Sequence, residues 1–159
     1  MNKKMPVRDL VTAALIAALY VVLTYVSAAF GLAYGAVQLR VSEALCILPL
    51  FTPSAIYGLT VGCLISNIGS SFGIMDMLFG TAATLLASAG TYLLRNTNKL
   101  LSLLPPVILN GIAVGAQVAI FSDGAGFLAT FFYVSLSQAI AVYGLGLPLS
   151  YLLKKIKLF

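Results

Sequence analysis

Long apolar runs dominate this chain and leave charged side chains almost no place except between the runs. Hydrophobic residues make up 61% of its 159 residues and charged residues only 8%, a balance that water-soluble domains do not have. An apolar run of about 20 residues can cross a bilayer as a helix, because a helix satisfies its own backbone hydrogen bonds. The sequence therefore predicts an all-α integral membrane protein in which residues 1–159 form a single membrane domain.

Proline, glycine and polar clusters divide the apolar sequence into six segments. The predicted spans lie near residues 10–30, 41–55, 57–71, 76–94, 103–121 and 128–153. One helix over residues 41–73 would be about 50 Å long, too long for a hydrocarbon core of about 30 Å. It would also carry Pro49 and Pro53 near its middle, where proline breaks a helix. Two short helices are therefore expected there.

The positive charges support six spans independently. With six spans, eight of the nine lysines and arginines fall on one side of the membrane: Lys3, Lys4, Arg8, Arg95, Lys99, Lys154, Lys155 and Lys157. Basic residues mark the cytoplasmic side. The sequence thus predicts a six-transmembrane-helix bundle with both termini cytoplasmic. A signal peptide is the competing interpretation of the N-terminal segment.

The residue types that most catalytic and metal sites need are scarce in this sequence. It contains no histidine, and its two cysteines, Cys46 and Cys63, both fall inside predicted helices. Neither a metal site nor a disulfide framework is expected from them, and no cofactor is predicted. Because phosphate-loop, zinc-protease and nucleophile-elbow motifs are also missing, the protein is not expected to be an enzyme. Any energy-driven work must use a partner or an ion gradient.

Arg40 departs from the charge pattern because it falls on the outer side of the membrane, three residues before Glu43. If the segment is helical there, the two residues share a face and can pair, which lowers the cost of placing them near hydrocarbon. One interpretation is a structural salt bridge. In the other, Glu43 accepts hydrogen bonds from a ligand and Arg40 donates to one.

Further polar side chains converge on the same half of the membrane. Asn67 closes the third predicted span and Asp76 opens the fourth, where Asp76 could instead cap the helix. Amides at such depth either bond between helices or line a pocket. The candidate substrate-binding residues are Arg40, Glu43, Asn67, Asp76, Gln117, Gln138, Tyr34 and Phe79.

The first predicted span carries two stripes of small residues. Ala13 and Ala17 form one stripe, and Ala14 and Ala18 form the other. Small residues four apart let a second helix approach closely. The stripes predict either packing within the bundle or a docking face for a partner protein.

Over nearly its full length the chain resembles the QueT-type queuosine-precursor transporters. Residues 34–45, 48–53, 62–67 and 76–85 carry the resemblance, and the string QLRVSEAL at 38–45 is its most specific part. Members of this family are S components, the substrate-binding subunits of energy-coupling factor (ECF) transporters. The resemblance implies a protein of the bacterial plasma membrane that captures its cargo from outside.

The resemblance also implies a cargo and partners. The cargo would be a 7-deazaguanine, such as 7-cyano- or 7-aminomethyl-7-deazaguanine. The alanine motif, here Ala13/Ala17 or Ala14/Ala18, would bind a transmembrane coupling subunit, and two ATPases would drive transport. The alternatives are an assembly subunit that binds no small molecule and a small ion-coupled carrier, which normally shows inverted repeats.

Overall fold

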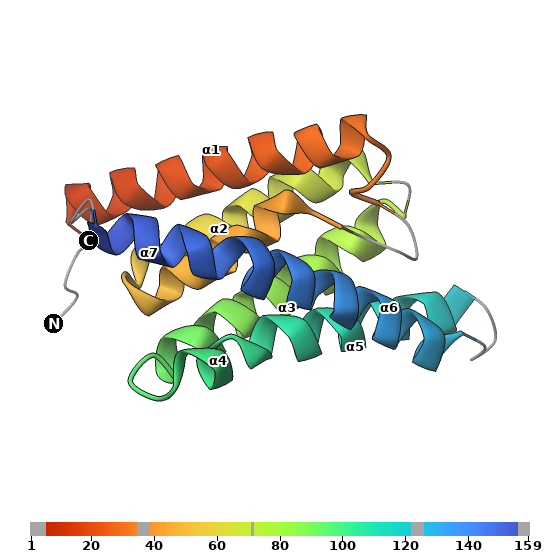
Figure 1. Ribbon diagram of the computed structural model, residues 1–159. Helices are drawn as coiled ribbons and strands as arrows, with labels where there is room; N and C mark the ends of the chain where they lie inside the picture. The colour runs from red at the N-terminus through yellow and green to blue at the C-terminus, as the bar shows by residue number, and fades with distance from the viewer. Residues whose placement is uncertain (1–5, 35–38, 71, 122–125, 156–159) are drawn as a thin grey trace, which may run out of the picture.

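The computed structural model describes residues 6–34, 39–70, 72–121 and 126–155, and all regular structure in these ranges is helical. The elements are α1 (Val7–Ala29), η1 (Val41–Leu50), α2 (Ser54–Ser66), η2 (Asn67–Gly69), α3 (Ile74–Leu93), α4 (Lys99–Ser102), α5 (Leu104–Phe121), α6 (Phe127–Ala139), η3 (Ile140–Gly146) and α7 (Leu147–Lys155). Several follow each other directly, so the described ranges form six helical segments packed into one bundle (Figure 1). The prediction of an all-α fold is confirmed.

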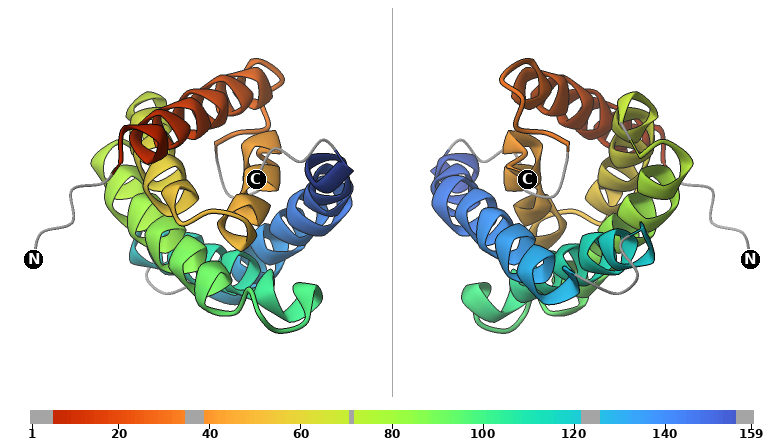
Figure 2. Two further views of the ribbon diagram at one scale, coloured as in Figure 1. Left: turned by 90° about the vertical axis from the view of Figure 1, so that its left-hand side faces the viewer. Right: turned by 90° about the vertical axis from the view of Figure 1, so that its right-hand side faces the viewer.

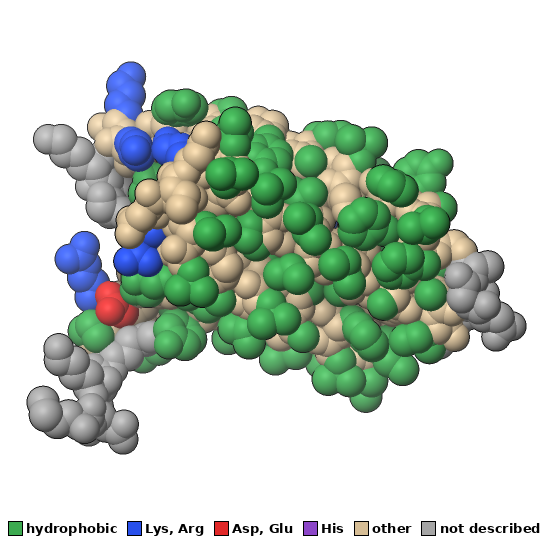
Figure 3. Space-filling model, turned by 90° about the horizontal axis from the view of Figure 1, so that it is seen from below, with side chains coloured by type: hydrophobic (Ala, Val, Ile, Leu, Met, Phe, Trp, Pro, Cys, Tyr) green, Lys and Arg blue, Asp and Glu red, His purple; other side chains and the backbone are tan. Residues whose placement is uncertain are grey.

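The surface and the helix lengths fit a membrane protein. Four segments are long and apolar enough to cross a membrane, namely Val7–Ala29, Ile74–Leu93, Lys99–Ile120 and Phe127–Lys155. The apolar segments Val41–Leu50 and Ser54–Gly69 are shorter. Hydrophobic side chains cover most of the face in Figure 3, and an apolar surface of this extent marks contact with lipid. The fold is that of a multi-pass membrane protein.

The predicted division of residues 41–73 into two short helices is confirmed. η1 ends just after Pro49, and α2 begins just after Pro53. Proline is compatible with the start of a helix because the first N–H groups there have no intrahelical partner. η1 is a 3₁₀ helix, and its residues 42–49 are all buried. Figure 2 shows η1 between α1 and the segment of α6 and α7.

Small residues bring α1 and α2 together. Ala13 and Ala17 lie on the buried face of α1. A Cβ atom on Gly58 would lie 2.6 Å from the Ala13 carbonyl oxygen, and one on Gly62 would lie 3.0 Å from the Ala17 carbonyl oxygen. The two backbones can approach this closely because both glycines lack a side chain.

The described lysines and arginines other than Arg40 gather at one end of the bundle, which we call the basic end. They are Arg8, Arg95, Lys99, Lys154 and Lys155. α1 and α4 begin at this end, and α3 and α7 finish there (Figure 1). Figure 3 shows positive side chains gathered at the same end. Lys3, Lys4 and Lys157 lie outside the described residues.

We predict that Gly58→Ala destabilises the bundle, because the added methyl group must push α1 away from α2. Overpacking of this kind costs about 1–3 kcal/mol in the free energy of unfolding. Unfolding in detergent can be followed with a thiol-reactive dye, since Cys46 and Cys63 are both buried. Gly144→Ala is the matched control, because a Cβ atom there would lie 4.0 Å from Ile140 Cγ2, which is an ordinary van der Waals distance. Equal stability of the two variants would contradict the prediction.

Candidate functional site

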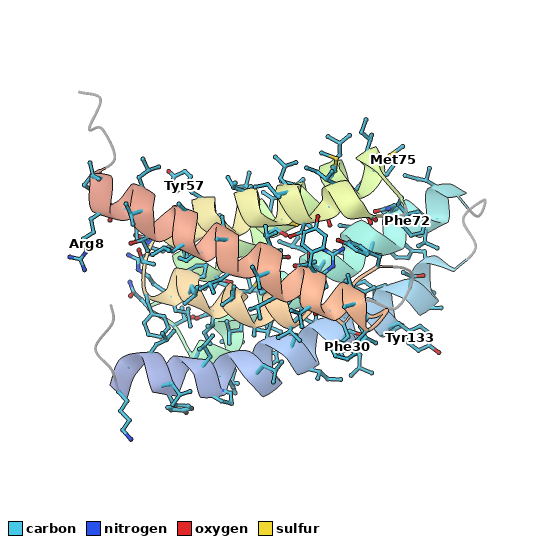
Figure 4. All side chains as sticks on the ribbon, turned by 90° about the horizontal axis from the view of Figure 1, so that it is seen from above. Arg8, Phe30, Tyr57, Phe72, Met75 and Tyr133 are labelled. Atoms are coloured by element: carbon cyan, nitrogen blue, oxygen red, sulfur yellow. The ribbon has the colours of Figure 1, made fainter. Side chains whose placement is uncertain are left out.

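A small polar cavity lies in the half of the bundle opposite the basic end. Its lining residues are Arg40, Glu43, Cys63, Asn67, Asp76, Gly80, Thr84, Asn110, Val114, Val134 and Gln138. The cavity volume is about 20 Å³, which is room for about one water molecule. In Figure 4, Arg8 marks the basic end, whereas Phe72 and Met75 mark the opposite end, where α3 begins.

Glu43 is a buried carboxylate with three donors. Its Oε1 accepts a hydrogen bond from the Tyr20 hydroxyl of α1 at 2.5 Å, and its Oε2 accepts from Gln138 Nε2 of α6 at 2.8 Å. The Cys46 thiol also donates to Oε2, at 3.1 Å. A buried charge is stable only with such partners. Glu43 thereby ties η1 to α1 and α6.

Asp76 is the second buried carboxylate, and it ties α3 to η2, which directly follows α2, and to α5. Its Oδ1 accepts from Gln117 Nε2 of α5 at 2.7 Å, and its Oδ2 accepts from the Ser70 hydroxyl. The backbone carbonyl of Asp76 accepts from Asn67 Nδ2 at 2.9 Å. Gly73 occupies the N-cap position of α3. Among the described residues, the Asp76 carboxylate bonds to Ser70 and Gln117 and not to a backbone N–H of α3, so the cap expected as an alternative is not found there.

Arg40 directly precedes η1, and its side chain is buried, with 7% of the residue exposed. Its Nε donates to the Ala33 carbonyl at 2.7 Å, and its guanidinium lies 5.3 Å from the centre of the Tyr34 ring. The Tyr34 hydroxyl in turn donates to the Ser66 carbonyl at 2.7 Å. Partial burial raises the pKa of this phenol, so it remains a protonated donor.

The contact ion pair expected between Arg40 and Glu43 is not found among the described residues, where both side chains have other partners. The physical reason is the backbone. Arg40 is extended, with φ −96° and ψ 119°, and the helix starts only after it. The two side chains therefore do not share a helical face, although both line the cavity.

Three buried amide atoms near the two carboxylates have no hydrogen-bond partner within the described part of the chain. They are Asn67 Oδ1, Gln117 Oε1 and Asn110 Nδ2. Asn67 and Asn110 line the cavity. Because an unpartnered buried polar atom is costly, such atoms mark positions where a ligand can bind. The same described ranges hold no cluster of His, Cys, Asp or Glu able to bind a metal ion.

Five of the eight candidate binding residues line the cavity: Arg40, Glu43, Asn67, Asp76 and Gln138. Gln117 reaches the site through its bond to Asp76, and Tyr34 through its contact with Arg40. Phe79 is half-buried on α3 and is not among the lining residues. Tyr20 was not predicted. A phenol in the middle of an apolar span needs a polar partner, and that signal could have identified it.

The two alanine stripes of α1 have different surroundings. Ala13 and Ala17 are buried against α2, whereas Ala14 and Ala18 are exposed. The first stripe therefore packs within the bundle. The second is free to contact another molecule.

Fold and cavity together define a multi-pass helical membrane protein with a buried polar site between its helices. The QueT transporter family matches residues 10–155, and the chain belongs to this family, which is one of transporters and not of enzymes. Over 83 residues the chain is 42% identical to the queuosine precursor transporter QueT of Lactococcus lactis subsp. cremoris (strain MG1363). That match covers 52% of this chain and 48% of the relative, so it spans about half the length of each. No solved structure matches the chain.

We predict that Tyr20→Phe destabilises the protein by about 1.5–3 kcal/mol, because the Glu43 carboxylate loses a donor inside the bundle. In a Glu43→Gln background the same change should cost less, since a neutral amide needs the phenol less. Unfolding of the two single variants and the double variant measures this coupling. Tyr57→Phe, at a tyrosine that is 55% exposed, is the control. Equal losses in both backgrounds would show that the Tyr20 hydroxyl does not stabilise the charge.

Proposed function

We propose that this protein is the substrate-binding S component of an ECF transporter and that it captures a queuosine precursor from outside the cell. The observation that carries the proposal is the buried cavity of a QueT-family member, lined by two carboxylates, a guanidinium and amides with unused hydrogen-bonding atoms. Such a site suits a small polar ligand with both donors and acceptors. In this proposal residues 1–159 act as one membrane domain.

In the proposed topology the chain crosses the bacterial plasma membrane six times, with both termini in the cytoplasm. The basic end supports this orientation because positive residues mark the cytoplasmic side. At about 2.0 Å per residue, η1 reaches about 20 Å. It is therefore too short to span the core unaided, but its burial shields its backbone from lipid. The cavity then lies in the outer half of the membrane.

The proposed cargo is a 7-deazaguanine such as 7-cyano- or 7-aminomethyl-7-deazaguanine. The guanine-like edge of these bases presents N–H and N–H₂ donors beside a carbonyl group. Glu43 can accept from the donors, and Asn110 or Arg40 can donate to the carbonyl. Tyr34 offers an aromatic face for the ring.

The cavity volume of about 20 Å³ is smaller than a bicyclic base, so cavity side chains must move when the ligand binds. Arg40 and Tyr34 can move without unwinding a helix, because neither belongs to one. The proposed substrate-binding residues remain Arg40, Glu43, Asn67, Asp76, Gln117, Gln138, Tyr34 and Phe79.

We predict that Glu43→Gln weakens binding of both 7-deazaguanines by about tenfold or more, because a charge-assisted hydrogen bond becomes a neutral one. Calorimetric titration of the purified protein in detergent measures this, with guanine and an unrelated vitamin as further ligands. Size-exclusion chromatography checks folding, and Asp9→Asn at the basic end is the charge-matched control. Unchanged affinity would remove Glu43 from the site. Absence of binding to both 7-deazaguanines by folded wild-type protein would overturn the proposed function.

The proposed partners are a transmembrane coupling subunit and two ATPases, since the described chain offers no machinery for ATP hydrolysis. The exposed stripe of Ala14 and Ala18 is a suitable docking face, because small residues let another helix approach closely. It lies in the half of α1 nearer the basic end, which is cytoplasmic in the proposed topology. Ala13 and Ala17 are already used against α2.

We predict that Ala14→Leu combined with Ala18→Leu abolishes recovery of the coupling subunit in a pull-down and leaves ligand affinity unchanged. The leucines fill the space that a partner helix needs but touch neither the cavity nor α2. Ala82→Leu combined with Ala129→Leu adds the same bulk at exposed alanines of α3 and α6 and should leave the complex intact. A stable complex formed by the Ala14 and Ala18 variant would show that docking occurs elsewhere.

A further inference from the structure

Hydrogen-bond acceptors outnumber donors around Asp76. Asp76 is 3% exposed, and from the described residues its carboxylate accepts one hydrogen bond on each oxygen, from Ser70 and Gln117. A carboxylate has about four acceptor positions, so about two are unused. Asn67 and Gln117 both direct their amide N–H groups toward Asp76, and both leave their side-chain oxygens without a partner among the described residues. The groups bonded to Asp76 therefore leave acceptors unused and not donors. The unused donor of the cavity, Asn110 Nδ2, belongs to α5.

The charges that line the cavity are also unbalanced. With all three groups ionised, Glu43, Asp76 and Arg40 sum to −1, and no other charged residue lines the cavity within the described part of the chain. Both carboxylates lie in the first turn of a helix, where the helix dipole stabilises a negative charge but supplies only about half a positive charge. Among the described residues the Glu43 carboxylate has three donors and the Asp76 carboxylate has two, and all five are neutral. Asp76 is thus the carboxylate that most needs a positive partner.

The position of Asn67 also indicates that a positively charged donor would bind beside Asp76. Its Nδ2 donates to the Asp76 carbonyl at 2.9 Å and to the Cys63 sulfur at 3.4 Å. With the nitrogen engaged on both sides, the oxygen is the atom left for a ligand. Gly80 makes room for this amide, since a Cβ atom there would lie 2.7 Å from Asn67 Nδ2. The arrangement fixes an acceptor beside the carboxylate.

We infer that Asp76 and Asn67 form a subsite for a positively charged amine on the cargo, so that the protein selects the 7-aminomethyl over the 7-cyano compound. The inference rests on the proposed function and names the substituent that the site recognises. A primary alkyl amine is protonated at neutral pH, as in lysine, and offers three donors and no acceptor. A nitrile is neutral and only accepts, so it would face the Asp76 and Asn67 oxygens without a bond.

The decisive experiment is calorimetric titration of the wild-type protein with three 7-deazaguanines that differ at one substituent. The aminomethyl compound is compared with its neutral counterpart of similar size, the hydroxymethyl compound, and with the cyano compound. We expect the aminomethyl compound to bind at least about tenfold more tightly than either neutral compound, as a charge-assisted hydrogen bond in a buried site provides. Equal or tighter binding of a neutral compound overturns this inference but leaves the proposed function intact. Binding of none overturns the proposed function itself.

Variants of single residues show which side chains produce the preference for the aminomethyl compound. Asp76→Asn keeps the size of the side chain and removes its charge, so the aminomethyl affinity should fall about tenfold or more while the hydroxymethyl affinity stays within about threefold. Asp9→Asn, the matched control, should change neither. Gly80→Ala displaces the Asn67 amide. It should therefore also lower the affinity for the aminomethyl compound and leave the affinity for the neutral compounds unchanged. If folded Asp76→Asn still preferred the aminomethyl over the hydroxymethyl compound, the inference would be overturned. If a variant does not fold, the wild-type ligand series still decides.

A free monovalent cation could satisfy the same acceptors. Titrations in sodium chloride and in choline chloride distinguish this case, because the choline cation is too large for the space beside the Asp76 and Asn67 oxygens. Preference for the amine in both salts supports the inference. If sodium raises the affinity of the neutral compounds to that of the amine, the subsite takes an ion and the inference is wrong.

Discussion

The buried carboxylate of Glu43 is the constraint on which the arrangement of the bundle depends. An ionised group inside a membrane protein is expensive unless donors surround it. Here the donors come from Tyr20 of α1 and Gln138 of α6, as well as from Cys46 on the same helix as Glu43. η1 can therefore lie in the interior only where the Tyr20 hydroxyl and the Gln138 amide reach the carboxylate. The requirement fixes the position of η1 against both neighbouring helices.

The last helical segment meets η1 at two points, and its irregular centre makes this possible. Gln138 bonds to Glu43, and a Cβ atom on Gly146 would lie 3.1 Å from the Ala44 carbonyl oxygen. On a regular α-helix, residues eight positions apart point about 80° away from each other. The wider π-helical segment η3 begins two residues after Gln138 and ends at Gly146, and its wider turns bring the two contacts toward one face. Turns of this kind occur often at functional sites.

The sequence predicts the six helical segments because apolar length and proline positions are local signals. It also predicts that Arg40, Glu43, Asn67, Asp76 and Gln138 meet, because polar groups in apolar helices must face the interior. Their individual partners depend on long-range geometry. The extended backbone of Arg40 has no clear local signal.

The two alanine stripes show the same limit. Both have the same spacing and composition in the sequence. The choice between them is made by the glycines Gly58 and Gly62 on α2, which accept the backbone of one stripe and leave the other exposed. Pairing between helices distant in sequence is not encoded in the pattern of either helix alone.

The two carboxylates belong to different sets of helices. Glu43 joins η1 to α1 and α6, whereas Asp76 joins α3 to η2 and α5. Both carboxylates line the cavity, so a ligand that contacts both connects the two sets. Any ligand that binds more tightly to one arrangement of these sets shifts the protein toward that arrangement, by no more than its difference in affinity. In the proposed function, the cargo would thereby stabilise one relative position of the helices while the exposed alanine stripe stays open to a partner. Recognition and docking would then use separate surfaces of one bundle.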